Sequence, residues 1–233
     1  MSSPRGRVLN EMRSGSVAVS DVAYMKDSVL RSHVHERAYV SVLVEGAYTE
    51  LHDGLPRYCA PGTVLPHAAG EVHADYFFAP GRCVNFVFRE DDRDWQEHLV
   101  HAVRATHPSL ERAVRNALFP PHQPNAVREP EWLRAVLDEF PWIEPVPIEH
   151  AARLAGTHPA HFARAFHKHV GMTPGRYRRR ERVRAASRML LESSRALSEI
   201  ANECGFADQS HLTNVFRESA GISPNRYRGA FTR

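Results

Sequence analysis

The sequence predicts an α+β fold, in which an N-terminal β-barrel with helices precedes an all-α C-terminal domain of two helix-turn-helix units. Three observations predict this division. Short segments rich in Val, Tyr and Phe occupy most of the first hundred residues, as strands would. From about Asp94 the apolar residues follow the period of a helix. Near the C-terminus, an eighteen-residue segment recurs fifty positions later.

The predicted strands include residues 16–25, 39–48 and 83–88, which are rich in Val, Tyr and Phe. Glycines and prolines between them provide turns that would connect neighbouring strands. These turn positions are Gly46, Asp53-Gly54, Pro61-Gly62, Gly70 and Pro80-Gly81. Several short strands this close together predict a small barrel or sandwich, which we assign to residues 1–93.

Residues 94–140 are predicted to form a helical linker. Two apolar stripes at helical spacing are formed by Trp95, Leu99 and Val103 and by Leu110, Val114 and Leu118. A proline-rich loop follows at 120–130, and then a short helix around Trp132, Val136 and Leu137. We expect the stripes to be buried against the barrel. A homodimer contact through Leu99, Val103, Leu110 or Val114 is the alternative.

Charge is distributed unevenly along the chain, whose formal net charge is +3. Residues 141–233 carry 15 Lys and Arg against 8 Asp and Glu, whereas residues 1–140 carry 15 against 19. A basic C-terminal domain predicts contact with a polyanion, although a solvated charged face would have the same composition. The stretch 141–147, PWIEPVP, interrupts regular structure and is the predicted domain boundary.

The cysteines and the apolar runs point to the cellular compartment. Cys59, Cys83 and Cys204 are scattered, with no CxxC pair, which argues against a disulfide scaffold or a cysteine-rich zinc site. The start of the chain lacks the apolar stretch of a signal peptide, and no run reaches transmembrane length. We therefore expect a cytoplasmic protein with no membrane partner, in which Cys59 and Cys83 are ordinary strand residues rather than redox sensors.

The internal repeat is the most informative feature of the sequence. Residues 161–178, HFARAFHKHVGMTPGRYR, recur as residues 211–228, HLTNVFRESAGISPNRYR. Upstream the offset falls from fifty to forty-nine, so that Ile148, Ala152 and Gly156 correspond to Leu197, Ala201 and Gly205. One residue has therefore been inserted in the second copy. Identity at this many positions indicates duplication of a structural element.

Each copy has the layout of a helix-turn-helix. Small alanines in the first helix allow a second helix to cross it closely. Gly156 and Gly205 stand where the first helix must end, a position that favours positive φ. Thr-Pro at 173–174 and Ser-Pro at 223–224 predict new helix starts, because each places a capping residue before proline. A helix from about Pro174 to Leu191 would join the copies and could hold their second helices about one DNA turn (~34 Å) apart.

These residues resemble the AraC family of bacterial transcription activators. The matching positions begin with Gly156, Phe162, Arg164, Phe166, Gly171, Thr173-Pro174, Tyr177, Arg182, Ala186 and Met189-Leu190. They continue with Ile200-Ala201, Gly205-Phe206, Asp208-Gln209-Ser210, Phe216, Gly221 and Ser223-Pro224. The resemblance covers roughly residues 140–233 and is specific, because spacing, caps and core positions agree together. It implies a DNA-binding transcription regulator rather than an enzyme, with residues 141–233 as the DNA-binding domain.

The resemblance further implies that outward residues of each second helix contact bases. In the first copy these are His158, Ala160, Ala163 and Arg164, and in the second copy Gln209, Ser210, His211, Thr213 and Asn214. Arginine suits guanine, Gln and Asn suit adenine, and alanine can make only apolar contact, for instance with a thymine methyl group. A solvent or phosphate contact is the alternative at each position. Arg178, Arg179 and Arg217 are predicted to contact phosphates.

Members of this family usually carry a second domain for sensing or dimerisation, often a cupin-like barrel. His33 and His35, at i and i+2, would lie on one side of a strand, and His73 stands where the last metal ligand of a cupin lies. The usual glutamate is missing, and Glu50 on the next predicted strand is a possible replacement. Three interpretations remain open: a divalent metal at these four residues, a metal-free pocket for a small effector, or structural histidines.

The expected partners are double-stranded promoter or operator DNA, an unidentified small effector, RNA polymerase and a second copy of the chain. Three rival functions are weaker. A metal-dependent cupin enzyme leaves the repeat unexplained, and a DNA-repair protein with this module would need a metal-bound cysteine cluster that the sequence lacks. A purely structural interaction module does not explain the exposed arginines.

Overall fold

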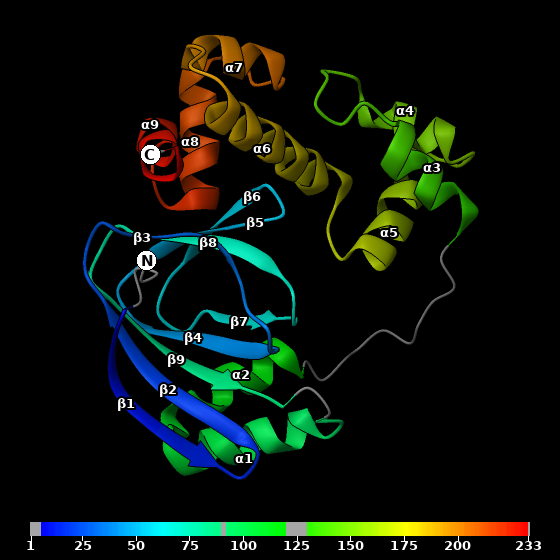
Figure 1. Ribbon diagram of the computed structural model, residues 1–233. Coiled ribbons are helices and arrows are strands. Elements are labelled where there is room, and N and C mark those ends of the chain that lie inside the picture. Colours follow the sequence, from blue (N-terminus) through cyan, green and yellow to red (C-terminus); the bar gives the residue numbers. More distant parts are fainter. Residues whose placement is uncertain (1–5, 90–91, 120–129, 233) are drawn as a thin grey trace. The chain divides into compact units, whose positions relative to one another are not determined.

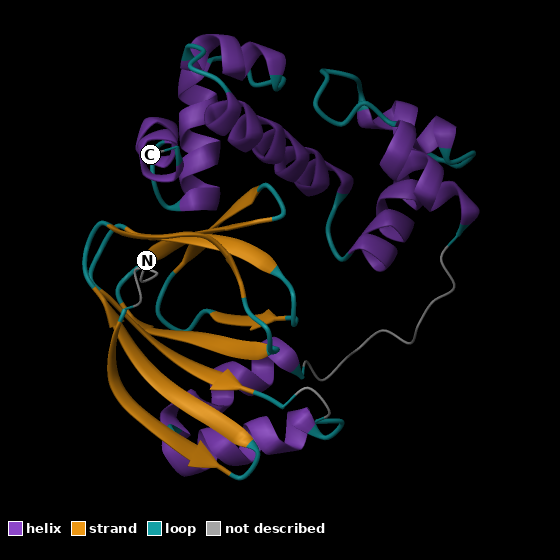
Figure 2. Ribbon diagram, in the orientation of Figure 1, coloured by secondary structure: helices purple, strands orange, loops and turns teal. Residues whose placement is uncertain are grey.

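The computed structural model describes residues 6–89, 92–119 and 130–232 of the chain, which form two compact bodies. The N-terminal body contains the described strands and helices α1 and α2. The C-terminal body contains helices α3 to α9, apart from a few residues near the end of the chain. This arrangement confirms the predicted α+β fold with an all-α C-terminal part (Figure 2).

Two antiparallel sheets form the barrel of the N-terminal body (Figure 1). The strands are β1 (Arg7–Ser14), β2 (Val17–Tyr24), β3 (Ser28–Val34), β4 (Tyr39–Glu45), β5 (Tyr48–His52), β6 (Leu55–Cys59), β7 (Val64–His67), β8 (Val72–Phe77) and β9 (Gly81–Val87). The larger sheet has the order β1-β2-β9-β4-β7, and the smaller has the order β3-β8-β5-β6. The three strand segments expected from composition are confirmed as parts of β2, β4, β5 and β9.

Alternation along β4 explains how one strand serves two hydrophobic layers. Successive side chains point to opposite faces of a strand. Val40 and Val42 pack with the helices that cover the larger sheet, whereas Leu43 packs in a separate cluster inside the barrel with Tyr48 and Phe77. Both faces of this strand are therefore buried, and its polar residues on the inner face line the barrel cavity.

Helices α1 (Trp95–Thr106) and α2 (Glu111–Leu118), with the short 3₁₀ turn η1 (Pro108–Leu110) between them, cover the outer face of the larger sheet (Figure 1). Leu99, Val103 and Val114 are fully buried in one core with the strand residues. The expected packing of these helices on the barrel is confirmed. These three side chains are therefore not available at the surface for the alternative homodimer contact.

The C-terminal body is entirely helical in the residues that the structure describes. Its helices are α3 (Glu131–Glu139), α4 (Ile148–Leu154), α5 (Pro159–Val170), α6 (Pro174–Glu192), α7 (Leu197–Glu203), α8 (Gln209–Ala220) and α9 (Pro224–Phe231). Helix α3 shares a core with α4 and α5, because Leu133 and Val136 pack with Phe162 and Phe166. Segment 94–140 is thus divided between two cores. Most of its expected loop, 120–129, lies outside the described residues, and the domain boundaries stay predictions.

Each copy of the repeat folds as two helices joined by a turn, followed by a third helix. The turns contain Gly156 at φ +63° and Gly205 at φ +73°, where an L-residue with a side chain would be strained. The Oγ1 of Thr173 accepts a hydrogen bond from the backbone N–H of Arg176 over 3.3 Å, which caps α6 as expected. Among the described helices, none combines the length and apolar character that crossing a membrane would require.

Candidate nucleic-acid interface and barrel cavity

Helix α5 is the second helix of the first copy and buries one aromatic stripe. Phe162 and Phe166 are fully buried, and their rings lie 5.4 Å apart. The helix begins after His158, whose Nδ1 accepts a 3.3 Å hydrogen bond from the backbone N–H of Ala160. Pro159 follows at the first helical position, where its missing N–H costs nothing. The buried stripe leaves the opposite side of α5 facing solvent.

The residues expected to contact bases lie on that side. His158, Ala160 and Arg164 are exposed, and Ala163 is partly exposed. His158 is therefore exposed and also caps the N-terminus of α5, which was not expected from the sequence. Arg164 lies near the middle of the exposed face and is the longest side chain among the four.

Helix α8 repeats this design in the second copy. Leu212 and Phe216 are fully buried, while Gln209, Ser210 and Asn214 are exposed. The helix is capped by Asp208, whose Oδ1 accepts a 2.7 Å hydrogen bond from the backbone N–H of His211. An Asp at this position also suits the positive end of the helix dipole.

Two of the expected readers in α8 already have partners within their own segment. The Nδ1 of His211 accepts a 3.2 Å hydrogen bond from the backbone N–H of Ala207, and its ring packs edge-on against Phe206. The hydroxyl of Thr213 donates to the carbonyl of Gln209 over 2.8 Å. Both are thus partly committed to the helix itself, which leaves Gln209, Ser210 and Asn214 as the better candidates for base contacts.

The arginines near the start of α6, which were expected to contact phosphates, also make contacts within the C-terminal body. Arg178 is half-buried, its guanidinium donates to the carbonyl of Val146, and it lies 5.4 Å from the ring centre of Phe140. Its expected phosphate contact therefore competes with a structural role. Arg179 is exposed and pairs with Glu218 of α8. Arg217 is exposed, as its predicted phosphate contact would require.

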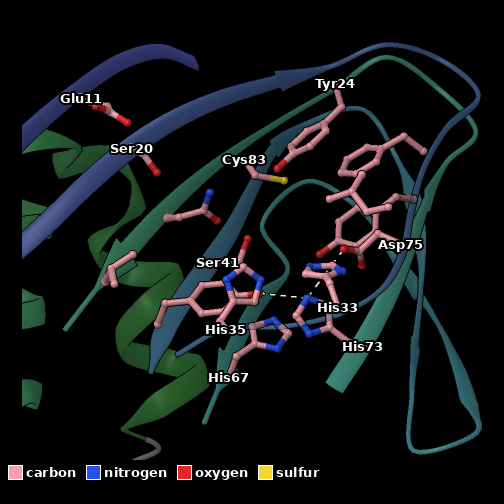
Figure 3. Close-up of a pocket in the computed structure, with 16 residues that line it drawn as sticks. Glu11, Ser20, Tyr24, His33, His35, Ser41, His67, His73, Asp75 and Cys83 are labelled. Atoms are coloured by element: carbon pink, nitrogen blue, oxygen red, sulfur yellow. Dashed lines mark hydrogen bonds and ion pairs between the residues drawn. The ribbon is translucent and has the colours of Figure 1, made fainter. Parts of the chain in front are cut away.

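The barrel encloses a cavity of about 480 Å³ (Figure 3). Its lining combines imidazole rings with hydroxyl, amide and carboxyl groups, among them Tyr24, Ser41, Asp75 and Asn85. Burial raises the pKa of Asp75 well above its ordinary value, and the neighbouring Glu50 adds to that shift. A cavity of this size with several converging polar groups is typical of a small-molecule site.

Four histidines gather on one side of this cavity (Figure 3). Nitrogen atoms of His33, His35 and His73 all lie within 4.8 Å of one another. The ring of His67 stacks on that of His73 at 4.5 Å. Three of the four were expected from the sequence. The fourth, His67, was missed because it approaches only through the pairing of β7 with β4, where it lies opposite Tyr39.

The hydrogen bonds of these rings occupy only some of their nitrogen atoms. His33 uses Nδ1 to contact the carbonyl of Arg31 at 2.8 Å, and His73 uses Nε2 to contact the hydroxyl of Tyr39 at 3.1 Å. The Nδ1 of His73 is buried, with no hydrogen-bond partner among the described residues. Burial and the neighbouring His67 lower the pKa of His73 to about 3, and burial lowers the pKa of His35 to about 4. Three converging imidazoles, two of them with lowered pKa values, fit a divalent transition metal.

Glu50 is not brought to this group of three. Its carboxylate is almost fully buried and lies 3.5 Å from Nε2 of His67 and 3.7 Å from Nη1 of Arg57. The other nitrogen of His67 contacts Glu71 at 2.9 Å. His67 therefore lies between two carboxylates, and Glu50 contacts His67 rather than the group of His33, His35 and His73. Burial raises the pKa of Glu50, and the neighbouring His67 and Arg57 oppose that shift.

The cysteines are buried and not activated. Cys83 lines the cavity, and burial raises the pKa of its thiol to about 12. Burial also raises the pKa of Cys59 and Cys204. A thiol with a raised pKa has little thiolate near neutrality, so these cysteines fit the expected structural role.

The C-terminal half of the chain matches known proteins in sequence. Residues 151–230 match the family described as a helix-turn-helix domain. An HTH-type transcriptional regulator of Mycobacterium tuberculosis is 42% identical over 84 residues, which are 36% of this chain and 32% of that protein. The chain thus spans about a third or less of the length of the curated relatives it matches.

Two solved structures resemble separate parts of the chain. The DNA-binding domain of AdpA, a global transcriptional factor solved in complex with a target DNA, is 31% identical, covering 43% of this chain and 88% of that chain with a TM-score of 0.39. A cupin superfamily protein from Desulfitobacterium hafniense is 15% identical, covering 39% of this chain and 84% of that chain with a TM-score of 0.32.

Proposed function

We propose that the protein is a transcription regulator that binds specific double-stranded DNA, because its residues 151–230 match a helix-turn-helix domain family and its relatives include an HTH-type transcriptional regulator. One structural observation supports this most strongly. Both copies bury the aromatic or apolar side of their second helix and expose the polar side, so α5 and α8 each offer side chains to a partner. A helix of this kind fits the major groove of B-DNA.

The two helices would make different contacts. Arg164 of α5 would bind guanine through two hydrogen bonds, while Ala160 and Ala163 would admit a thymine methyl group. Gln209 and Asn214 of α8 would bind adenine, with Ser210 contacting either a base or a phosphate. His158, His211 and Thr213 stay secondary candidates because each has an internal hydrogen bond.

The length of helix α6 can be compared with the distance between successive major grooves of DNA. Its 19 residues correspond to about 28 Å at 1.5 Å per residue. Successive major grooves on one face of DNA are about 34 Å apart. A connector of this length supports the proposal that one chain reads two successive major grooves.

Selection of DNA by the intact chain tests this function. Duplexes recovered from a random-sequence library should converge on two short motifs, and their affinity should fall steeply with salt as phosphate counterions are released. The matched control is a duplex of the same composition with scrambled motifs. Failure to enrich any sequence, or equal affinity for scrambled DNA, would exclude sequence-specific binding.

For the barrel, we propose that His33, His35 and His73 bind a divalent transition metal and that the cavity accepts a small effector. Three converging imidazoles and the unpartnered Nδ1 of His73 among the described residues support the metal. The metal would supply a Lewis-acidic centre for a ligand in the cavity. Elemental analysis of untagged protein tests this proposal. Protein that contains no metal, and that binds none when offered zinc, nickel or iron, would exclude it.

A further inference from the structure

The segment between α3 and α4, residues 141–147, has no regular structure and is held by two arginines of α6. Arg178 donates to the carbonyl of Val146. Arg182, one helical turn later, donates from Nε to the carbonyl of Ile143 over 3.2 Å and from Nη2 to the carbonyl of Glu144 over 3.1 Å. An irregular segment is thereby fixed to the connector helix at three of its carbonyl groups.

Aromatic packing anchors the same segment as well. The Trp142 side chain is buried, and its Nε1 donates to the carbonyl of Leu137 over 3.3 Å. Its ring lies 4.7 Å from that of Tyr177 in α6 and 5.6 Å from that of Phe166 in α5. The segment therefore belongs to the core of the first copy.

The turn of the second copy contacts this anchored segment directly. A Cβ atom built on Gly205, between α7 and α8, would lie 1.9 Å from the carbonyl oxygen of Ile143 and 3.0 Å from the guanidinium of Arg182. At Gly156, the equivalent turn position of the first copy, a Cβ atom would have no neighbour within 4 Å. Both glycines have positive φ, but only Gly205 also provides space for a close approach.

Arg182, like Gly205, makes a contact that is not repeated in the other copy. Arg178 recurs as Arg228, and each of these holds the segment that leads into the first helix of its own copy. Fifty positions after Arg182 the chain has Thr232, so this arginine has no counterpart in the second copy. It is the arginine that lies against both the first copy's leading segment and the second copy's turn.

We propose that residues 141–147, Arg182 and Gly205 form a brace that fixes the second copy relative to the first, and so sets the half-site spacing that the chain accepts. The proposal rests on the DNA-binding function above and goes beyond it. Helix α6 alone connects the two copies only through the continuous chain. The brace adds a second, separate contact between the leading segment of the first copy and the turn of the second. Arg182 and Gly205 are then positioning residues, which determine where α5 and α8 lie without touching DNA.

Spacing selectivity tests the brace. The probes are duplexes with both selected motifs at their natural separation, duplexes with one to five inserted base pairs, and duplexes with one motif only. Each inserted base pair rotates the second motif by about a tenth of a turn. The wild-type chain should therefore lose binding sharply with insertion. Arg182→Gln should bind the natural duplex about 5- to 20-fold more weakly, bind single motifs unchanged, and lose affinity less with each insertion.

Two matched controls separate the brace from general damage. Arg188→Gln changes an exposed arginine of the same helix and should behave as wild type. Gly156→Ala and Gly205→Ala introduce similar backbone strain, so a loss of spacing selectivity in Gly205→Ala beyond that in Gly156→Ala reports the contact with Ile143. If Gly205→Ala does not fold, Arg182→Gln decides the outcome.

The results that overturn the brace are distinct from those that overturn DNA binding. If no motif is selected, the proposed function fails. If two motifs are selected but Arg182→Gln keeps the affinity and the spacing selectivity of the wild-type chain, the brace is wrong. A wild-type chain that tolerates all insertions equally would also contradict it.

Discussion

Arg228 donates a 2.7 Å hydrogen bond from Nη2 to the carbonyl oxygen of Arg195, two residues before α7 begins. In the first copy, Arg178 makes the same contact with Val146, two residues before α4 begins. The duplication thus preserves a specific tertiary contact as well as a pattern of helices. In each copy, the third helix holds the segment that leads into the first.

This contact predicts a stability effect that exposed arginines would not have. Arg178→Met should lower the free energy of unfolding by about 1–3 kcal/mol, because a charged hydrogen bond to a partly buried carbonyl is lost. Arg188→Met, on the exposed side of α6, should change it by less than about 0.5 kcal/mol. Urea unfolding followed by circular dichroism measures both. Equal effects of the two substitutions would contradict this structural role of Arg178.

Much of the C-terminal body could be predicted because its determinants are local. These determinants are the apolar spacing, the glycines at the turns and the Thr-Pro and Ser-Pro pairs, which each act within a few residues. The repeat supports the assignments, because the same signals occur in both copies. The half-buried position of Arg178 could not be predicted in this way. It depends on a chain segment thirty-two residues earlier folding back onto α6.

The barrel was predictable in class but not in the details of its site. Strand composition and turn residues indicate a barrel, yet the partners of a side chain depend on which strands pair. His67 reaches the cavity because β7 pairs with β4, and Glu50 faces His67 rather than the three expected ligands. Neither relationship has a local sequence signal. His33, His35 and His73 could be found because their spacing itself resembles a known pattern.

Arg164 and Arg217 should differ in how they affect DNA binding. Arg164→Ala should weaken binding to the selected duplex by about 1–3 kcal/mol and relax preference at one base pair, because a guanine contact is lost. Arg217→Ala should weaken binding to all sequences alike and reduce the salt slope by about 1, as expected for a phosphate contact. Fluorescence anisotropy at several salt concentrations distinguishes them. Uniform loss with Arg164→Ala would show that it contacts phosphate.

Metal content should depend on the cavity histidines and not on Glu50. The double substitution of His33→Ala and His35→Ala should remove the metal from untagged protein. Glu50→Gln should retain it, because the Glu50 carboxylate lies beside His67 and Arg57. Plasma emission spectrometry of the purified variants measures the content. Loss of metal in Glu50→Gln alone would place that carboxylate among the ligands.

Acid should weaken the barrel through Asp21. Two hydrogen bonds from Arg82, of 2.9 and 2.6 Å, hold the pKa of Asp21 below its ordinary value of 3.8. A carboxyl group with a lowered folded-state pKa contributes stability above its unfolded pKa and loses it as the pH falls through the folded pKa. Unfolding by urea at pH 6 and pH 3 should therefore differ less in Asp21→Asn than in wild type. Glu45→Gln, which alters an exposed partner of the same arginine, should not reduce the difference.

The central claim is that two copies of one helical unit bind neighbouring stretches of a single duplex. Hydroxyl-radical and methylation footprinting of the intact chain on a selected duplex tests it most directly. We predict two protected major-groove segments on one face of the DNA, with centres about 10 base pairs apart. A single protected segment, or two segments on opposite faces, would contradict the account.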